Sequence, residues 1–158
     1  MIRILVLFTL ILTTLVCLTD RADAQDDTQD DTQEHRSCSV CGMDRKAYGY
    51  SRMLITYHDG TQTGVCSLHC AVSELDSHKD RPVSSLLVAD RDTRRLIDSG
   101  KAVWVMGGKK RGVMTQRPKW AFGTEEAARS FIAANGGVIA SWAEVQAAAR
   151  EEIVHKSH

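Results

Sequence analysis

The sequence lacks a net charge and lacks the motifs of several common enzyme classes. Its 20 Lys and Arg residues balance its 20 Asp and Glu residues. From residue 35 onward, 18 basic residues stand against 13 acidic ones, too diffusely placed to indicate a nucleic-acid partner. The chain has no glycine-rich phosphate loop, no helix with paired carboxylates and no Ser-His-Asp arrangement. We therefore expect a binding protein rather than an enzyme.

A long hydrophobic run is also missing. The apolar stretch at residues 4–18 is shorter than the roughly 20 residues that a membrane-spanning helix needs, and a basic residue precedes it. The sequence Ala-Asp-Ala at residues 22–24 then offers the small-x-small pattern of a signal-peptidase site. These features predict a signal peptide over residues 1–24 and a periplasmic or otherwise exported protein. An uncleaved membrane anchor is the alternative.

A lipid anchor is a second way in which the exported protein would be held at a membrane. Cys17 lies at the end of the apolar run, where a lipoprotein carries its acylated cysteine. The bulky Val16 directly before it fits such a processing site poorly. Secretion is therefore favoured over lipidation, and membrane association stays open.

An acidic repeat follows the predicted signal peptide. Residues 26–34 read DDTQDDTQE, with five acidic groups, no basic group and no apolar side chain. A segment of this composition cannot bury enough apolar surface to offset the entropy lost on ordering. We predict a disordered acidic linker over residues 25–37 and a folded domain over residues 38–158.

The pattern of strand, turn and helix signals in residues 38–158 predicts an α+β protein. We expect two small ββα-like units packed together, at about residues 38–100 and 101–158. In the first unit, two strands flank the hairpin signal Asp59-Gly60, and a helix follows. In the second, two strands flank a glycine-punctuated basic loop before another helix. The expected strands are 52–58, 61–66, 82–89, 102–106, 119–122 and 138–140; the expected helices are 67–75, 124–135 and 141–154, with a short turn or helix at 92–99.

Four cysteines follow the predicted cleavage site, in two close pairs. Cys38 and Cys41 have x-x spacing ahead of the first strand, so one turn brings both thiols to a single ion. Cys66 and Cys70 have x-x-x spacing, which places them on the same side of a helical turn. This arrangement predicts a treble-clef-like thiol site. Two disulfides, a structural Zn(II) site and a soft-metal site all remain open.

Methionine and histidine near the cysteines favour a soft metal. Met43 directly follows Cys41-Gly, and His69 lies inside the second pair. Met114 lies beyond the basic loop in a glycine-rich segment, where a methionine has little packing role. Thiolate and thioether ligands together favour Cu(I), whereas Zn(II) rarely binds methionine. The candidate ligands are Cys38, Cys41, Met43, Cys66, His69, Cys70 and Met114.

Two other classes of function compete with copper binding. A secreted interaction module stapled by Zn(II) or by disulfides needs the four cysteines but not the methionines. A thiol redox protein would use Cys38 and Cys41 as its redox pair. That motif normally opens a helix in a βαβ unit, whereas here Gly42-Met43 and a hairpin follow.

The chain resembles the NosL family, accessory proteins of nitrous oxide reductase. The likeness begins with Cys-Ser-Val-Cys-Gly-Met at residues 38–43 and continues through Val-Cys-Ser-Leu-His-Cys-Ala at 65–71, as in the cysteine-rich branch of the family. It extends through residues 102–114 and Lys-Trp-Ala-Phe at 119–122. It thus covers most of residues 36–137.

The resemblance implies an exported, usually lipid-anchored Cu(I) metallochaperone of two ββα units. The implied partner is a periplasmic copper enzyme such as nitrous oxide reductase, or its assembly machinery. Cys38 or Cys41, Met43 and Met114 are the implied copper ligands. The second cysteine pair exceeds what a minimal Cu(I) chaperone needs, and whether the chain forms a homodimer stays open.

Overall fold

Two antiparallel sheets and three helices make up the part of the chain described by the computed structural model, residues 30–156. The first sheet has the strand order β2-β1-β3-β4 and the second the order β6-β5-β7. The elements are β1 (Met53–Tyr57), β2 (Gln62–Val65), α2 (Leu68–Ser77), β3 (Val83–Ala89), β4 (Leu96–Asp98), β5 (Val103–Met106), β6 (Lys119–Phe122), α3 (Glu125–Asn135), β7 (Val138–Ala140) and α4 (Trp142–Lys156). The predicted α+β class and its two ββα-like units are confirmed.

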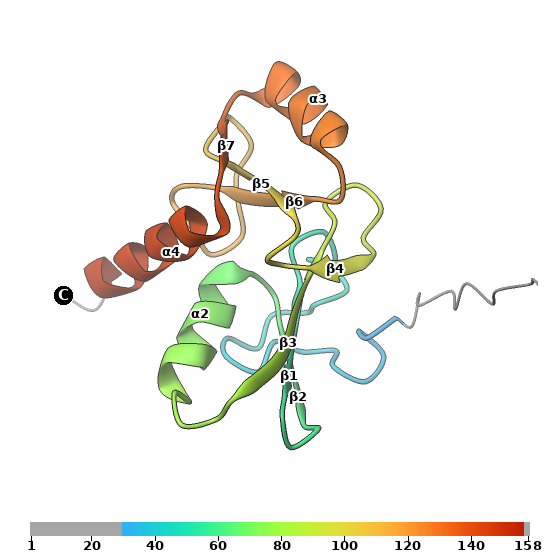
Figure 1. The fold of residues 1–158 in the computed structure, drawn as a ribbon, viewed down its shortest axis with the longest axis vertical. Helices are drawn as coiled ribbons and strands as arrows, with labels where there is room; N and C mark the ends of the chain where they lie inside the picture. Colours follow the sequence, from blue (N-terminus) through green and yellow to red (C-terminus); the bar gives the residue numbers. More distant parts are fainter. Residues whose placement is uncertain (1–29, 157–158) are drawn as a thin grey trace, which may run out of the picture.

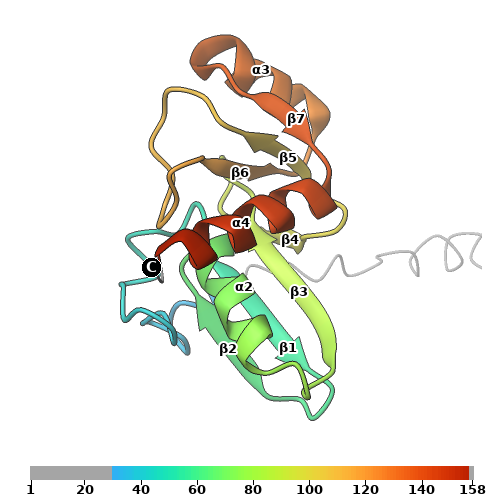
Figure 2. The ribbon, with the colours of Figure 1, turned by 90° about the vertical axis from the view of Figure 1, so that its left-hand side faces the viewer.

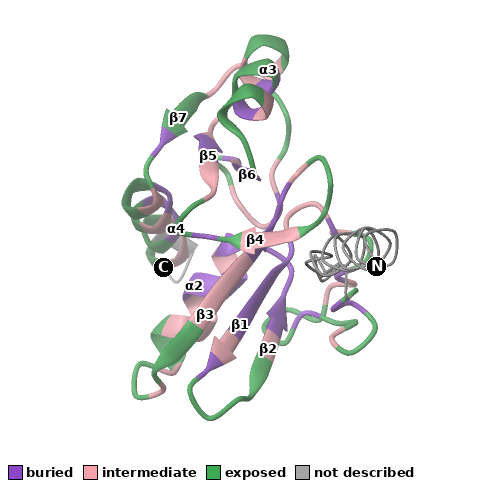
Figure 3. Ribbon diagram, turned by 45° about the vertical axis from the view of Figure 1, so that its right-hand side comes forward, coloured by how far each residue is buried: buried purple, intermediate pink, exposed green. Residues whose placement is uncertain are grey.

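The first sheet grows from the predicted hairpin. Asp59 accepts hydrogen bonds from the backbone N–H and the hydroxyl of Thr61, and Gly60 takes a positive φ of 82°. This turn sets a register in which Met53 of β1 lies opposite Val65 of β2. Strand β1 is central in this sheet and almost fully buried, as Figure 3 shows. After β1 the chain returns along β2, which ends shortly before α2.

Capping interactions begin the two helices of the second unit. The Thr124 side chain accepts a hydrogen bond from the N–H of Ala127 at the start of α3. Ser141 and Glu144 form a reciprocal capping box before α4, as the S-x-x-E pattern predicts. Ser67 also stands at the N-cap position of α2, but its side chain makes no capping hydrogen bond there.

Helix α4 joins the two units. It packs against α2 of the first unit and against β5 of the second (Figures 1 and 2). The Trp142 ring at its start stacks on Trp104 of β5, with ring centroids 5.3 Å apart. A smaller aromatic cluster with Trp120, Phe122 and Phe131 lies between α3 and its sheet. The cysteine-bearing segment therefore lies in a core that both units share.

Two predictions about local structure need correction. Residues 92–99, expected as a short turn or helix, form a turn and then strand β4, which pairs with β3. Residues 30–37, expected as part of a disordered linker, are ordered, and Asp31 is buried. Ion pairs from Asp31 to Arg45 and Arg52 hold this segment in place.

The predicted signal peptide and residues 25–29 lie outside the described residues, as does any anchor at Cys17. Within residues 30–156, no helix has the length and apolar character needed to cross a membrane.

Candidate metal centre

A tight loop brings together the first cysteine pair. The backbone N–H of Cys38 donates to the Met43 carbonyl at 2.8 Å, and the N–H of Gly42 donates to the Cys38 carbonyl at 2.8 Å. Gly42 has a φ of 76°, which a residue with a side chain rarely adopts. The loop therefore folds back after Cys41 and turns both thiols to the same side.

The second pair comes from the junction of β2 and α2. Cys66 directly follows β2, and Cys70 lies in the first turn of α2. Both side chains are fully buried. The Ser51 hydroxyl donates to the Cys66 carbonyl at 2.9 Å and so fixes the backbone at this junction.

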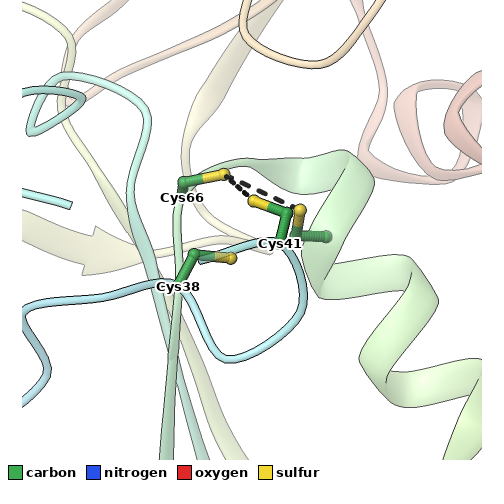
Figure 4. Close-up of side chains that lie close together, drawn as sticks. Cys38, Cys41 and Cys66 are labelled. Atoms are coloured by element: carbon green, nitrogen blue, oxygen red, sulfur yellow. Dashed lines mark hydrogen bonds between the residues drawn. The ribbon is translucent and has the colours of Figure 1, made fainter. Parts of the chain in front are cut away.

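The four thiols converge on one point (Figure 4). The sulfur atoms of Cys38, Cys41, Cys66 and Cys70 all lie within 4.8 Å of one another, and all four are free thiols. The Cys41 and Cys66 sulfurs are 3.5 Å apart, and the Cys66 and Cys70 sulfurs are 3.7 Å apart. Four sulfurs at about 2.3 Å around one tetrahedral ion would lie about 3.8 Å apart. The cluster is therefore the right size for one metal ion.

The thiols of the cluster have unequal acidities. Hydrogen bonds from the thiols of Cys66 and Cys70, of which the one from Cys66 has the larger effect, lower the pKa of Cys38 far below its ordinary value. The hydrogen bond to Cys38 raises the pKa of Cys66 to about 12, and burial adds to this rise. Hydrogen bonds to Cys38 and Cys66, together with burial, also raise the pKa of Cys70. Without metal, the cluster thus retains protons that a bound cation would displace.

Accessibility also differs among the cysteines. Cys38, Cys66 and Cys70 are buried, whereas Cys41 is exposed. Three thiols would therefore bind an ion from within the core, while the fourth can be reached from solvent. An incoming thiol would meet the cluster at Cys41.

A buried ion-pair network supports the centre, and sequence reasoning missed it. Arg45 is fully buried and pairs with Asp31, while its Nε donates to the Val65 carbonyl at 3.1 Å. Its Nη2 donates to the Met53 carbonyl at 2.9 Å. Arg45 thus holds β1 and the residue before Cys66 in one position. The sequence signal was slight, because Arg45 stands between Asp44 and Lys46 in a charged run that gives no sign of burial.

The remaining predicted ligands, Met43, His69 and Met114, are not among the four converging thiols. Met43 and Met114 are partly buried and pack against the hydrophobic core that contains three of the cysteines, so the expectation that Met114 has little packing role was wrong. Met114 has a φ of 56°, unusual for a residue with a side chain. His69 is not in the four-cysteine group and lines a small cavity with Thr115 and Lys119. Their role as ligands remains a prediction.

The fold and site define a class: small α+β proteins of two ββα-like units with a four-cysteine candidate metal centre. The NosL family model matches residues 29–150, and the chain belongs to the NosL family. Its fold is similar to that of the copper chaperone NosL from Shewanella denitrificans, with a TM-score of 0.53 and 18% sequence identity. That match covers 68% of this chain and 87% of the other. Among curated proteins, no relative matches the chain.

Proposed function

We propose that this protein is an exported Cu(I)-binding metallochaperone. The observation that carries the proposal is the convergence of four free thiols, three buried and one exposed, in a member of the NosL family. Thiolates and thioethers are soft ligands that favour Cu(I). The similar structure from Shewanella denitrificans is that of a copper chaperone, which supports the same metal.

The exposed thiol suggests how the cargo would be transferred. Cu(I) would be held by two or three sulfur atoms, and a thiol of the partner would bind beside Cys41 before an original ligand leaves. Ligand exchange of this kind needs one accessible ligand and a low coordination number. We propose a periplasmic copper enzyme such as nitrous oxide reductase, or its assembly machinery, as the recipient.

A Cu(I) titration of the reduced chain from Gln25 onward tests this function. A competing Cu(I) chelator such as bicinchoninate would report the affinity, with Zn(II) titrated in parallel. We expect one tightly bound Cu(I) per chain. Replacing Met43 and Met114 together by Leu keeps the side-chain volume but removes both thioethers, so it should weaken Cu(I) binding by about tenfold or more.

Met106→Leu is the matched control, because Met106 is partly buried in the same core and ends strand β5. It should leave the Cu(I) affinity unchanged. A chain that binds only Zn(II), or whose four cysteines form stable disulfides and bind no metal, would contradict the proposal.

One observation favours a second candidate function, a structural Zn(II) site. Four thiols whose sulfur atoms lie within 4.8 Å of one another match the size of a four-sulfur Zn(II) site, and tetrahedral sulfur sites are typical of zinc. A structural site would stabilise the fold, whereas a chaperone must release its metal. The two functions differ in the rate at which a competing thiol chelator removes the ion: slow for the structural site and fast for the chaperone.

A further inference from the structure

A cation-lined cleft lies on the side of the protein where the β5–β6 loop approaches the turn after β3. Its lining includes four basic residues, Arg91, Arg94, Lys110 and Arg111, and two aromatic residues, Tyr50 and Trp120. The cleft has a volume of about 360 Å³. Asp92 is the single carboxylate in its lining. The cleft therefore carries a clear excess of positive charge.

Most of this charge is not neutralised by the protein. Arg91 pairs with Asp92 and lies 5.2 Å from the Phe131 ring centroid, so its position is fixed. Within residues 30–156, Arg94, Lys110 and Arg111 have no ion-pair partner. All three are exposed. These groups are available to a bound anion.

The aromatic wall of the cleft and the backbone of Arg94 are held in place by the fold. The ring centroids of Tyr50 and Trp120 lie 6.0 Å apart in a stacked arrangement, and Trp120 is buried. Arg94 is held with a φ of 62°; its N–H donates to Asp90, and its carbonyl accepts a hydrogen bond from Arg52. These parts of the cleft are already ordered before a ligand binds, which reduces the conformational entropy lost on binding.

The cleft is linked to the metal centre through two segments of the chain. Tyr50 precedes Ser51, whose hydroxyl donates to the Cys66 carbonyl. On the other side, Lys110 and Arg111 also border a second cleft, and Met114 lines that one. A ligand in the cation-lined cleft would thus contact the loop that carries Met114 and the segment that supports Cys66.

We propose that the cation-lined cleft binds an acidic segment of the protein that exchanges metal with this chain. Arginine guanidinium groups bind carboxylates through two parallel hydrogen bonds, and lysine adds a flexible positive charge. The concave, aromatic-walled shape fits a few carboxylate side chains of a peptide better than the face of a lipid bilayer. The proposal rests on the proposed function, since it assigns a partner to the copper chaperone.

The test is the binding of a fluorescein-labelled octa-aspartate peptide to the reduced, metal-free chain from Gln25 onward, followed by fluorescence polarisation. The double variant Lys110→Glu plus Arg111→Glu should weaken binding by about tenfold or more, because two attractions become repulsions. Arg94→Gln should weaken it by a few fold. Raising the ionic strength to 1 M should abolish binding, since salt shortens the Debye length to about 3 Å.

The matched control is Lys79→Glu plus Lys101→Glu, which makes the same change in net charge at exposed positions outside the cleft. Equal losses in the two double variants would overturn the proposal, because binding would then depend on overall charge alone. Binding to phosphatidylglycerol vesicles with none to the peptide would overturn it as well.

A Cu(I) titration of the same variants separates this proposal from the proposed function. Unchanged Cu(I) affinity with lost peptide binding supports the cleft and shows that the variant is folded. Because the peptide assay uses metal-free protein, a failure of Cu(I) binding in the unmodified chain would refute the chaperone without affecting the peptide result.

Discussion

Replacing Asp31 by Asn tests whether the start of the described chain is an integral part of the fold. The Asp31 carboxylate is 6% exposed and pairs with Arg45, which is fully buried, and with Arg52, whose Nε lies 2.6 Å from Oδ1. Removing the negative charge would leave two buried guanidinium groups without a counterion.

The size of the effect follows from this burial. Removing one partner of a buried ion pair typically costs about 3–5 kcal/mol of stability. Here the value should lie near 3 kcal/mol, because Arg45 keeps its hydrogen bonds to the carbonyls of Val65, His35 and Met53. With a urea m value of about 2 kcal/mol/M, this corresponds to a midpoint lowered by about 1.5 M.

Urea unfolding of the reduced protein, followed by tryptophan fluorescence, measures the midpoint. Asp76→Asn is the control, because Asp76 forms an exposed ion pair with Arg150. Such pairs contribute about 1 kcal/mol at most, so the control midpoint should fall by less than about 0.5 M. If Asp31→Asn shifts the midpoint no more than Asp76→Asn does, residues 30–36 are not held by this network and the reasoning fails.

Two further predictions concern the metal centre and the loop beside it. Metal affinity should rise with pH by about tenfold per pH unit for each proton displaced, because raised pKa values keep Cys66 and Cys70 protonated at neutral pH. Competition with a chelator at pH 6.5 and pH 7.5 measures this rise. An affinity that does not change with pH would contradict the prediction. Glu152→Gln should lower stability by about 2–3 kcal/mol at pH 7. Glu152 forms an ion pair with Lys119, whose side chain is 3% exposed, and it accepts a hydrogen bond from the Thr115 hydroxyl. The pKa of Glu152 lies below its usual value, since its hydrogen bonds with Thr115 and Lys119 outweigh the opposing effect of burial. Its contribution should therefore persist above the unfolded pKa of about 4.3 and disappear as pH falls through the folded pKa. Urea midpoints at pH 7 and pH 3 measure this, and the exposed neighbour Glu151→Gln should change little.

Each cysteine pair could be predicted from the sequence because its geometry is set by local structure. The x-x spacing of Cys38 and Cys41 needs only a tight loop, and Gly42 supplies its positive φ. The spacing of Cys66 and Cys70 needs only a helix that starts where the hairpin ends. The hairpin itself carried the strong signal Asp59-Gly60. Local signals of this kind survive in one sequence without knowledge of the tertiary contacts.

The ordered start of the chain could not be predicted, because its stability comes from distant partners. The DDTQ repeat has the composition of a solvated linker, and nothing in its pattern distinguishes Asp31 from its acidic neighbours. Only the fold places Arg45 and Arg52 where they can pair with that carboxylate. Strand β4 was missed for a related reason: three residues are too few to show an alternating pattern, and its pairing with β3 defines it.

One carboxylate links the two sites of this molecule. Arg45 pairs with Asp31 and donates a hydrogen bond to the carbonyl of Val65, the residue before Cys66 of the metal centre. Arg52, the other partner of Asp31, donates hydrogen bonds to the carbonyls of Gly49 and Arg94, each at 2.8 Å. Gly49 precedes Tyr50, and Arg94 itself lines the cation-lined cleft, so these bonds position its walls. The cleft and the metal centre are therefore not independent in stability, since both depend on the same buried charge. A partner that binds the cleft would therefore bind a surface whose position relative to the cysteines is already fixed by the fold.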